Sequence, residues 1–269
     1  MSKKFNLDKY YTPDSVVNYV TTKAKEIVGD TFDYVIEPSA GGGAFIKAIE
    51  STFKNGEKVY LDLQPTSDGI VQQDYLEYVP QEGRCLVIGN PPFGTRNTLS
   101  VRFFKKSLYA EYIVFVLPVS QLNNNQQMFE FDLIHSEDLG KVLFYNEHGD
   151  IRDVPCCLNI YKKPIGGFNK KKKYKFKEVS IFDYRKSLHF NKDLRHPNIA
   201  TCAWGSGVGK ECEPKTYSQE LHIFSDNPDI VNFIRVFDWS TVCSKTASPA
   251  LYRWHIYEEL LKNFKITEA

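Results

Sequence analysis

The chain has 269 residues, of which 42% are hydrophobic, and its formal net charge is +1 at pH 7. This length allows one large domain or two modest ones. The sequence shows no signal peptide, no apolar run of membrane-spanning length and no internal repeat. Residues 1–163 hold 17 Lys and Arg against 21 Asp and Glu, whereas residues 164–269 hold 17 against 12. The two parts therefore carry −4 and +5, which weakly indicates that the C-terminal part meets a polyanion.

The cysteines form no C-x-x-C pair and no zinc-finger spacing. They are Cys85, Cys156, Cys157, Cys202, Cys212 and Cys243. The pattern predicts buried free thiols and no metal site. We expect a soluble protein that is kept reduced inside a cell, in the cytoplasm or at the nucleoid.

The first predicted element is a helix, because apolar residues recur at three- and four-residue steps from Val16 to Ile27. It follows the stretch Tyr11-Thr12-Pro13, and either Thr12 or Asp14 could cap it.

A strand, a glycine-rich turn and a second helix are predicted between Tyr34 and Ile49. The turn reads Glu37-Pro38-Ser39-Ala40-Gly41-Gly42-Gly43, and its glycines would let a ligand lie against bare backbone. The spacing lacks the G-x-G-x-x-G of dinucleotide sites and the Lys of a phosphate loop, which disfavours NAD and ATP. Glu37 would also repel a pyrophosphate, so the turn suits a ligand with a positive end.

Two further acids follow predicted strands. Asp62 ends the strand 59–62, about twenty residues after the turn, where a ribose diol is often held. Asp74 follows residues 71–73 and could accept a hydrogen bond from the amino group of an adenine. Either acid alone could be a solvated loop residue, but two acids at strand ends favour a binding pocket.

The stretch Asn90-Pro91-Pro92-Phe93 follows the apolar run 85–88, which predicts a buried strand. Ligands of open α/β sheets bind at such strand ends. The side-chain oxygen of Asn90 and the carbonyl of Pro91 could accept two N–H groups, and Phe93 offers a flat face. An aromatic exocyclic amine fits all three, because two acceptors can draw its nitrogen towards tetrahedral geometry. The stretch alone could equally be an Asn-Pro turn.

The chain continues with a predicted helix at 101–108, an apolar strand at 112–118 and a polar loop at 123–127. Two more strands, 141–145 and 156–161, bracket a loop at 146–155. This alternation predicts a Rossmann-like α/β sheet that is mostly parallel and closes with an antiparallel hairpin.

In their order and spacing, these motifs over residues 8–163 resemble those of the S-adenosylmethionine-dependent adenine-N6 DNA methyltransferases of the gamma arrangement. The resemblance implies the class I methyltransferase fold and S-adenosylmethionine as cofactor. It implies a catalytic centre of Asn90, Pro91, Pro92 and Phe93, and cofactor contacts from Tyr11, Thr12, Pro13, Glu37, Pro38, Ser39, Ala40, Gly41, Gly43, Asp62, Asp74 and Asn90. Pro155 departs from the pattern, because some relatives place a second aromatic against the target base there.

Residues 164–269 carry no motif that resembles a known family. A basic tract begins with Lys170-Lys171-Lys172-Lys173, and Tyr174 and Phe176 follow between further lysines. The lysines could contact successive phosphates of a nucleic acid, and the two aromatic rings could stack on bases. The same tract could be a solvated linker. Helices are predicted at 231–237 and 252–264, and we expect a smaller α+β domain. By its position and charge, the resemblance implies that this domain reads the target sequence.

The sequence therefore predicts methyl transfer to adenine N6, in DNA by preference, with the target base flipped out and stacked on Phe93. Catalysis would be mostly positioning and hydrogen bonding, without a metal or a covalent enzyme intermediate. Related Asn-Pro-Pro motifs act on adenine in RNA or on a glutamine amide in proteins. These activities, and a nonenzymatic nucleic-acid-binding module, remain the alternatives.

Overall fold

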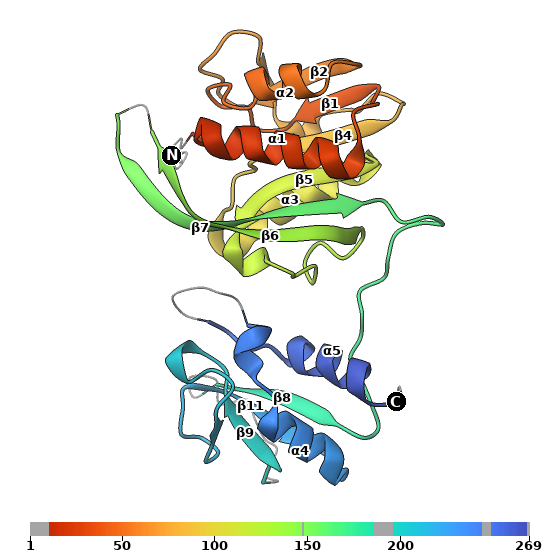
Figure 1. Cartoon of the computed structure of the whole chain (residues 1–269), viewed down its shortest axis with the longest axis vertical. Helices are drawn as coiled ribbons and strands as arrows, with labels where there is room; N and C mark the ends of the chain where they lie inside the picture. Colours follow the sequence, from red (N-terminus) through yellow and green to blue (C-terminus); the bar gives the residue numbers. More distant parts are fainter. Residues whose placement is uncertain (1–10, 147, 186–195, 244–248, 268–269) are drawn as a thin grey trace, which may run out of the picture. The chain divides into compact units, whose positions relative to one another are not determined.

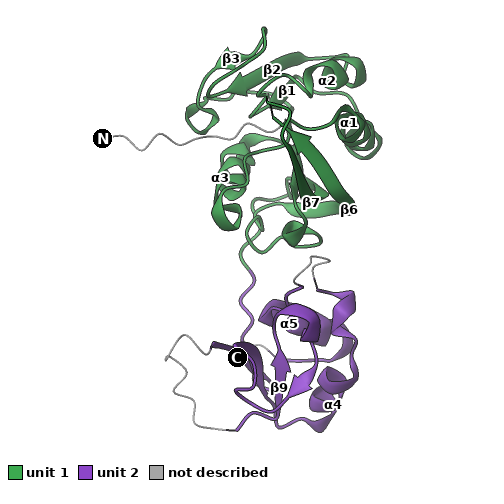
Figure 2. Cartoon of the chain, turned by 90° about the vertical axis from the view of Figure 1, so that its left-hand side faces the viewer, with its two compact units in different colours: residues 1–171 green, residues 172–269 purple. Residues whose placement is uncertain are grey.

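The computed structural model describes residues 11–146, 148–185, 196–243 and 249–267. The chain divides into two compact units, Met1–Lys171 and Lys172–Ala269 (Figure 2), whereas the sequence places the boundary after residue 163. Residues 163–169 stay with the first unit because the Lys163 N–H donates to the Glu111 carbonyl at 2.9 Å and the Asn169 N–H to the Glu130 carbonyl at 3.0 Å. Residues 8–10, where the resemblance begins, lie outside the described part.

The first unit is a seven-stranded sheet in the order β3-β2-β1-β4-β5-β7-β6 (Figure 1). Strands β1 to β5 are parallel, and β7 runs antiparallel to both β5 and β6. The strands are β1 (Tyr34–Glu37), β2 (Glu57–Asp62), β3 (Val71–Gln72), β4 (Cys85–Gly89), β5 (Tyr112–Pro118), β6 (Asp132–Tyr145) and β7 (Ile151–Lys162), and the helices are α1 (Asp14–Val28), α2 (Ile46–Thr52) and α3 (Thr98–Lys106). The predicted Rossmann-like sheet with an antiparallel hairpin is confirmed.

Both faces of this sheet are covered, α1 and α2 lying on one side and α3 on the other (Figure 2). Along β4, Leu86 and Ile88 pack with the side chains of α1 and α2, while Val87 packs with those of α3. A strand buried on both faces reads as a continuous apolar run, which is why β4 and β5 could be located from the sequence.

The hairpin of β6 and β7 is longer than predicted. Residues 151–155, expected in a loop, belong to β7, and Tyr145 pairs with Ile151. Strand β5 ends where Pro118 pairs with Cys156, so the hairpin continues past the carboxyl edge of the sheet, where β6 pairs with β7 and, at Tyr145, with Tyr11. Ile151 is 70% exposed there, and the weak apolar signal of a half-exposed hairpin explains the error.

The predicted cap of α1 is also wrong. Pro13 holds the N-cap position and no side chain caps the helix, while Asp14 is its first residue. Thr12 is 4% exposed, and its Oγ1 accepts a hydrogen bond from the Asn90 Nδ2 and caps no N–H of the helix.

The second unit is a four-stranded antiparallel sheet in the order β10-β9-β11-β8, with two helices. Its elements are β8 (Ser180–Arg185), β9 (Ile199–Cys202), β10 (Glu211–Cys212), β11 (Gln219–Phe224), α4 (Pro228–Val236) and α5 (Arg253–Asn263). One apolar core joins Ile181 and Ile223 of the sheet to Ile234 of α4 and Ile256 of α5. The expected α+β unit and both of its helices are therefore confirmed.

All six cysteines lie in the described part and are free. Five are buried as predicted, whereas Cys212 on the edge strand β10 is only half-buried. Among the described helices, none combines the length and the apolar character needed to cross a bilayer.

Candidate active site

The predicted motifs meet at the carboxyl edge of the first sheet. Glu37 ends β1, Asp62 ends β2 and Asn90 directly follows β4, and β1 lies between β2 and β4. After β1, the chain forms β2 and β3 on one side of β1, and it then crosses to form β4 on the other side of β1. Such a reversal is the switch point at which α/β sheets bind ligands.

Glu37 is a buried carboxyl group without a complete set of partners. It is 2% exposed, and its Oε2 accepts no hydrogen bond from any described residue. Gly89 lies against it, since a Cβ at that position would come within 3.2 Å of the Glu37 Cγ. Burial raises the pKa of Glu37 well above its usual value, and the neighbouring Asp62 carboxylate raises it further. A cationic ligand group at this position would supply the missing partner.

The glycine turn is fixed by Asp62. One carboxylate oxygen of Asp62 accepts the Gly41 N–H at 2.8 Å and the other accepts the Gln64 N–H at 2.7 Å. Gly41 and Gly43 have φ of 54° and 82°, a conformation that favours glycine. Because a carboxylate has about four lone-pair sites, Asp62 can hold the turn and still accept from the diol of a ligand.

Tyr11 lies over this turn. A Cβ on Gly42 would approach the Tyr11 ring to 2.5 Å, so glycine is needed there for the ring to fit. The Tyr11 N–H donates to the Tyr145 carbonyl at 2.7 Å, and its hydroxyl lies 3.3 Å from the Thr66 Oγ1. Tyr11 therefore joins the end of β6 to the loop that follows β2.

The loop after Asp62 supplies contacts that the sequence did not predict. The Thr66 N–H donates to the Gly41 carbonyl at 3.1 Å, and the Ser67 hydroxyl donates to the Gly42 carbonyl at 2.7 Å. The only available signal was a short polar run after a strand, which is typical of any loop. Asp74 follows β3 as expected, and one of its oxygens accepts the Leu76 N–H at 2.9 Å, which closes the turn after it.

Asn90 is held at two points. Its Nδ2 donates to the Thr12 Oγ1 at 3.1 Å, and its main-chain carbonyl accepts from the Ser39 hydroxyl at 3.1 Å. Its Oδ1 is buried and accepts no hydrogen bond within the described part of the chain. The site therefore presents one unused side-chain acceptor at the end of β4.

The rest of the tetrapeptide is anchored in the fold. The Pro92 carbonyl accepts from the Ser100 hydroxyl and the Phe93 carbonyl from the Leu99 N–H, both at 3.2 Å. Together with the bond from Ser39 to Asn90, this leaves the Pro91 carbonyl as the one main-chain acceptor of the four with no described donor. Phe93 is half-buried and packs against the core beneath α1 and α2, so only part of its ring can meet a ligand.

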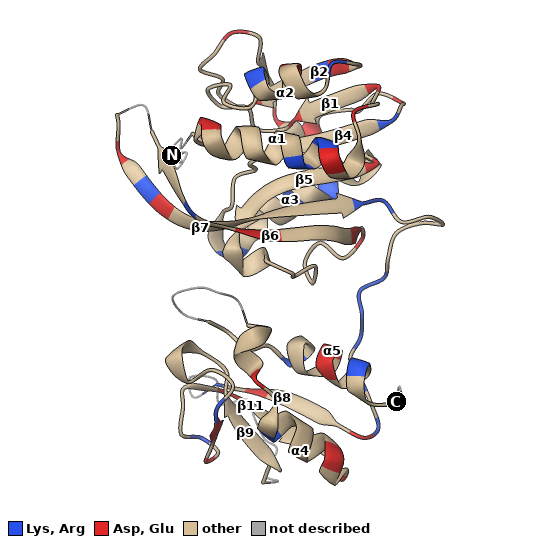
Figure 3. Ribbon diagram, viewed as in Figure 1, with Lys and Arg blue, Asp and Glu red and all other residues tan. Residues whose placement is uncertain are grey.

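The four lysines at 170–173 are exposed and form the boundary between the two units (Figure 3). Lys172 pairs with Glu258 of α5, Nζ to Oε1, at 2.7 Å. The prediction that Tyr174 and Phe176 stack on bases is wrong. Phe176 is 6% exposed in the second core, and Tyr174 stacks on Tyr257 with ring centroids 5.4 Å apart and an interplanar angle of 2°.

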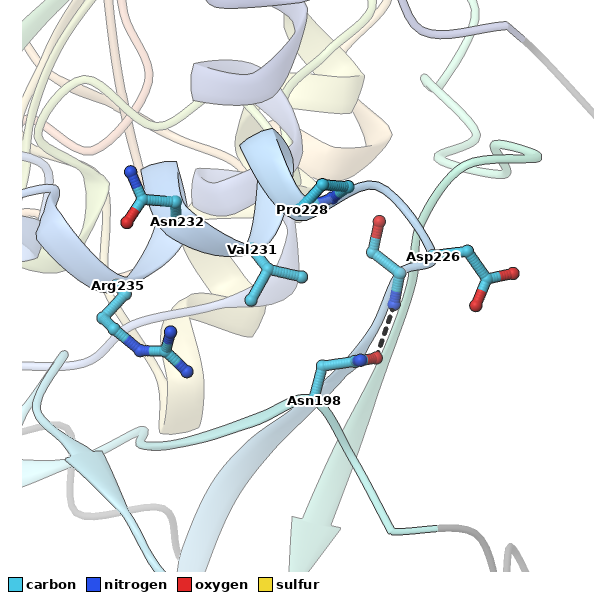
Figure 4. A pocket seen from close by; sticks show the side chains of 7 residues that line it. Asn198, Asp226, Pro228, Val231, Asn232 and Arg235 are labelled. Atoms are coloured by element: carbon cyan, nitrogen blue, oxygen red, sulfur yellow. Dashed lines mark hydrogen bonds between the residues drawn. The ribbon is translucent and has the colours of Figure 1, made fainter.

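The second unit also carries an open pocket of about 440 Å³ beside the start of α4 (Figure 4). Asn198 lines the pocket, and its Oδ1 accepts the Ser225 N–H at 2.8 Å. Arg235 lines the pocket but is paired with Glu211, and Asp226 adds a negative charge. The pocket contains no residue of the predicted motifs, so it is separate from the candidate site.

The first unit has the class I methyltransferase fold. A structure from Pyrococcus horikoshii, of a protein proposed to be an RNA methyltransferase, matches it with a TM-score of 0.50 and 16% sequence identity, covering 61% of this chain and 91% of that one. At this identity the similarity shows the fold alone.

The curated proteins that resemble part of the chain include two type II methyltransferases, although no protein-family model matches it. A type II methyltransferase of Thermus thermophilus is 30% identical over 97 residues, covering 33% of this chain and 22% of that protein. A type II methyltransferase of Paramecium bursaria Chlorella virus XZ-6E is 32% identical over 111 residues, covering 36% of this chain and 28% of that protein. The chain thus spans about a quarter of the length of these relatives. The similarities confirm the resemblance to methyltransferases.

Proposed function

We propose that this protein transfers a methyl group from S-adenosylmethionine to the N6 amine of adenine in DNA. The observation that carries the proposal is the pair of buried, unpaired oxygens at neighbouring strand ends, Oε2 of Glu37 and Oδ1 of Asn90. The first suits a positively charged group and the second suits an N–H donor. The partial similarity to two type II methyltransferases supports methyl transfer.

The glycine turn and its acids fit S-adenosylmethionine. The turn offers bare backbone, Asp62 retains lone pairs for a ribose diol, and the buried Glu37 can neutralise the positive end of the cofactor. Asp74 supplies an oxygen for the amino group of the cofactor adenine. When bound, the cofactor supplies an electrophilic methyl group.

Asn90 and Pro91 would activate the target amine. Its lone pair is delocalised into the base, so the nitrogen is a poor nucleophile until its two hydrogens are held. The Asn90 Oδ1 and the Pro91 carbonyl accept these hydrogens, and the bonds strengthen as positive charge develops on the nitrogen. After the methyl group has been transferred, the positively charged nitrogen gives one proton to water, so no base has to remove a proton beforehand.

An adenine within a duplex cannot reach this edge, so the target base is flipped out and its face rests on Phe93. The partial burial of Phe93 supports this role, because packing against the core fixes the ring. The second unit reads the target sequence, and Lys170–Lys173 contribute contacts to backbone phosphates. The basic second unit favours a polyanion over protein, and the resemblance of Tyr11-Thr12-Pro13 together with this additional unit favours DNA over RNA.

Incubation with methyl-labelled S-adenosylmethionine and a panel of duplex DNA, single-stranded DNA, RNA and protein tests the proposal. We expect label in duplex DNA. Label in RNA or in protein alone would favour the corresponding alternative activity. Binding of DNA without label on any substrate would favour a nonenzymatic nucleic-acid-binding module.

A further inference from the structure

The catalytic use of Asn90 depends on which way its amide faces. The oxygen and the NH₂ group of an Asn side chain have nearly the same shape, yet one accepts and the other donates. Rotation of the amide by half a turn would present two N–H groups to the hydrogens of the target amine. The proposed reaction needs the oxygen there, so the site must favour one orientation.

Thr12 is the described residue that contacts the other half of this amide. Its Oγ1 lies 3.1 Å from the Asn90 Nδ2, and the Asn90 Oδ1 has no described partner. Thr12 belongs to a segment 78 residues earlier in the chain. This segment is fixed on both sides, because Tyr11 pairs with Tyr145 and the first turn of α1 follows at Asp14.

A hydroxyl group can accept from Nδ2 or donate to Oδ1, so Thr12 by itself tolerates both orientations. The target amine removes this ambiguity, because its N–H can bond only to Oδ1. Nδ2 then needs an acceptor in a site where Thr12 is only 4% exposed, and a buried N–H without an acceptor is unfavourable. The Thr12 Oγ1 meets this need.

We propose that Thr12 is a positioning residue for methyl transfer, which holds the Asn90 amide with Oδ1 towards the target amine. The inference rests on the proposed function and adds a residue that acts through Asn90. It predicts that loss of the Thr12 oxygen slows the chemical step, while the affinity for DNA is retained and the affinity for the cofactor changes less than the rate.

Thr12→Val and Thr12→Ser form a matched pair, because Val keeps the shape of Thr without the oxygen and Ser keeps the oxygen. We expect Thr12→Val to lower the single-turnover rate about tenfold, or about 1.4 kcal/mol, and Thr12→Ser to stay within about twofold of wild type. The cofactor Kd from calorimetry should differ between the two variants by much less than their rates do. A wild-type rate for Thr12→Val, or an equal loss in both variants, would overturn the inference.

A double variant tests whether Thr12 acts through Asn90. In an Asn90→Ala background there is no amide to orient, so Thr12→Val should cause no further loss. A second tenfold loss would show that Thr12 acts elsewhere, and the inference would be wrong. A wild-type protein that methylates no substrate would overturn the proposed function as well, whereas an active wild type with an equally active Thr12→Val variant would overturn this inference alone.

Discussion

Replacing Glu37 by Gln is expected to stabilise the folded protein at neutral pH and to weaken cofactor binding. Burial, and then the Asp62 carboxylate, raise the pKa of Glu37 well above the usual 4.5. Above pH 4.5 the unfolded chain therefore loses this proton while the folded protein keeps it. The free energy of unfolding falls with rising pH in that window, at up to about 1.36 kcal/mol per pH unit, until the raised pKa is passed. Gln carries no such proton, so Glu37→Gln removes this slope.

Urea unfolding at half-unit steps from about pH 4.5 to 8 measures the effect. The stability of Glu37→Gln relative to wild type should increase with pH, whereas Glu82→Gln, which alters an exposed carboxylate of the same unit, should follow wild type. Calorimetry at neutral pH should show weaker binding of S-adenosylmethionine to Glu37→Gln, because Gln cannot release a proton to form the carboxylate that the positive end of the cofactor would stabilise. Parallel stability profiles of Glu37→Gln and wild type would refute the claim that the buried carboxyl keeps its proton.

Three further predictions concern catalysis and DNA binding. Asn90→Ala should lower the single-turnover rate about 100- to 1000-fold, equivalent to about 2.7–4 kcal/mol, while cofactor binding largely survives. Asn55→Ala, in an exposed loop, is the control, and a wild-type rate for Asn90→Ala would exclude the tetrapeptide as the catalytic centre. Phe93→Ala should reduce the fluorescence increase of an adenine analogue at the target position, because base stacking is worth about 1–3 kcal/mol, while Phe93→Trp should retain most of the increase; an unchanged increase in the Ala variant would count against stacking on Phe93. Replacing Lys170–Lys173 by Ala should weaken binding to all duplex sequences alike and flatten the slope of log K against log salt by about 0.9 per lost phosphate contact, whereas an unchanged slope would make the tract a linker.

The sheet and the placement of the motif residues could be predicted from the sequence because each rests on a local pattern. Strands β4 and β5 are buried on both faces and read as continuous apolar runs. Glu37, Asp62 and Asn90 lie at or directly after strand ends, and the ends of parallel strands share one edge of a sheet. Predicting the strands therefore also predicted that these residues come together.

The pairing of Thr12 with Asn90 could not be predicted, because it joins residues 78 positions apart. From its neighbours, Thr12 looked like an ordinary helix cap. Tertiary contact with the end of β4 instead uses its hydroxyl oxygen, and Pro13 starts the helix without a side-chain cap. A cap prediction from sequence considers only local partners and fails where a distant donor competes.

The aromatic residues after the lysine tract misled the prediction for a similar reason. Lys173, Lys175 and Lys177 are exposed, while Tyr174 and Phe176 between them turn towards the core of the second unit. Alternating charge and aromatic character is shared by nucleic-acid-binding segments and by an extended segment with one face buried. The contacts of Tyr174 and Phe176 with Tyr257 of α5 show that this segment is of the second kind, with one face buried.

Analysis of the modified nucleoside identifies the atom that receives the methyl group. Duplex DNA methylated by the wild-type protein is digested to nucleosides, and the position of the methyl group is determined by chromatography and mass spectrometry. We expect N6-methyldeoxyadenosine from the wild-type protein, and its formation at least about 100-fold more slowly by Asn90→Ala. A methyl group on a cytosine or on another atom of adenine would contradict this expectation.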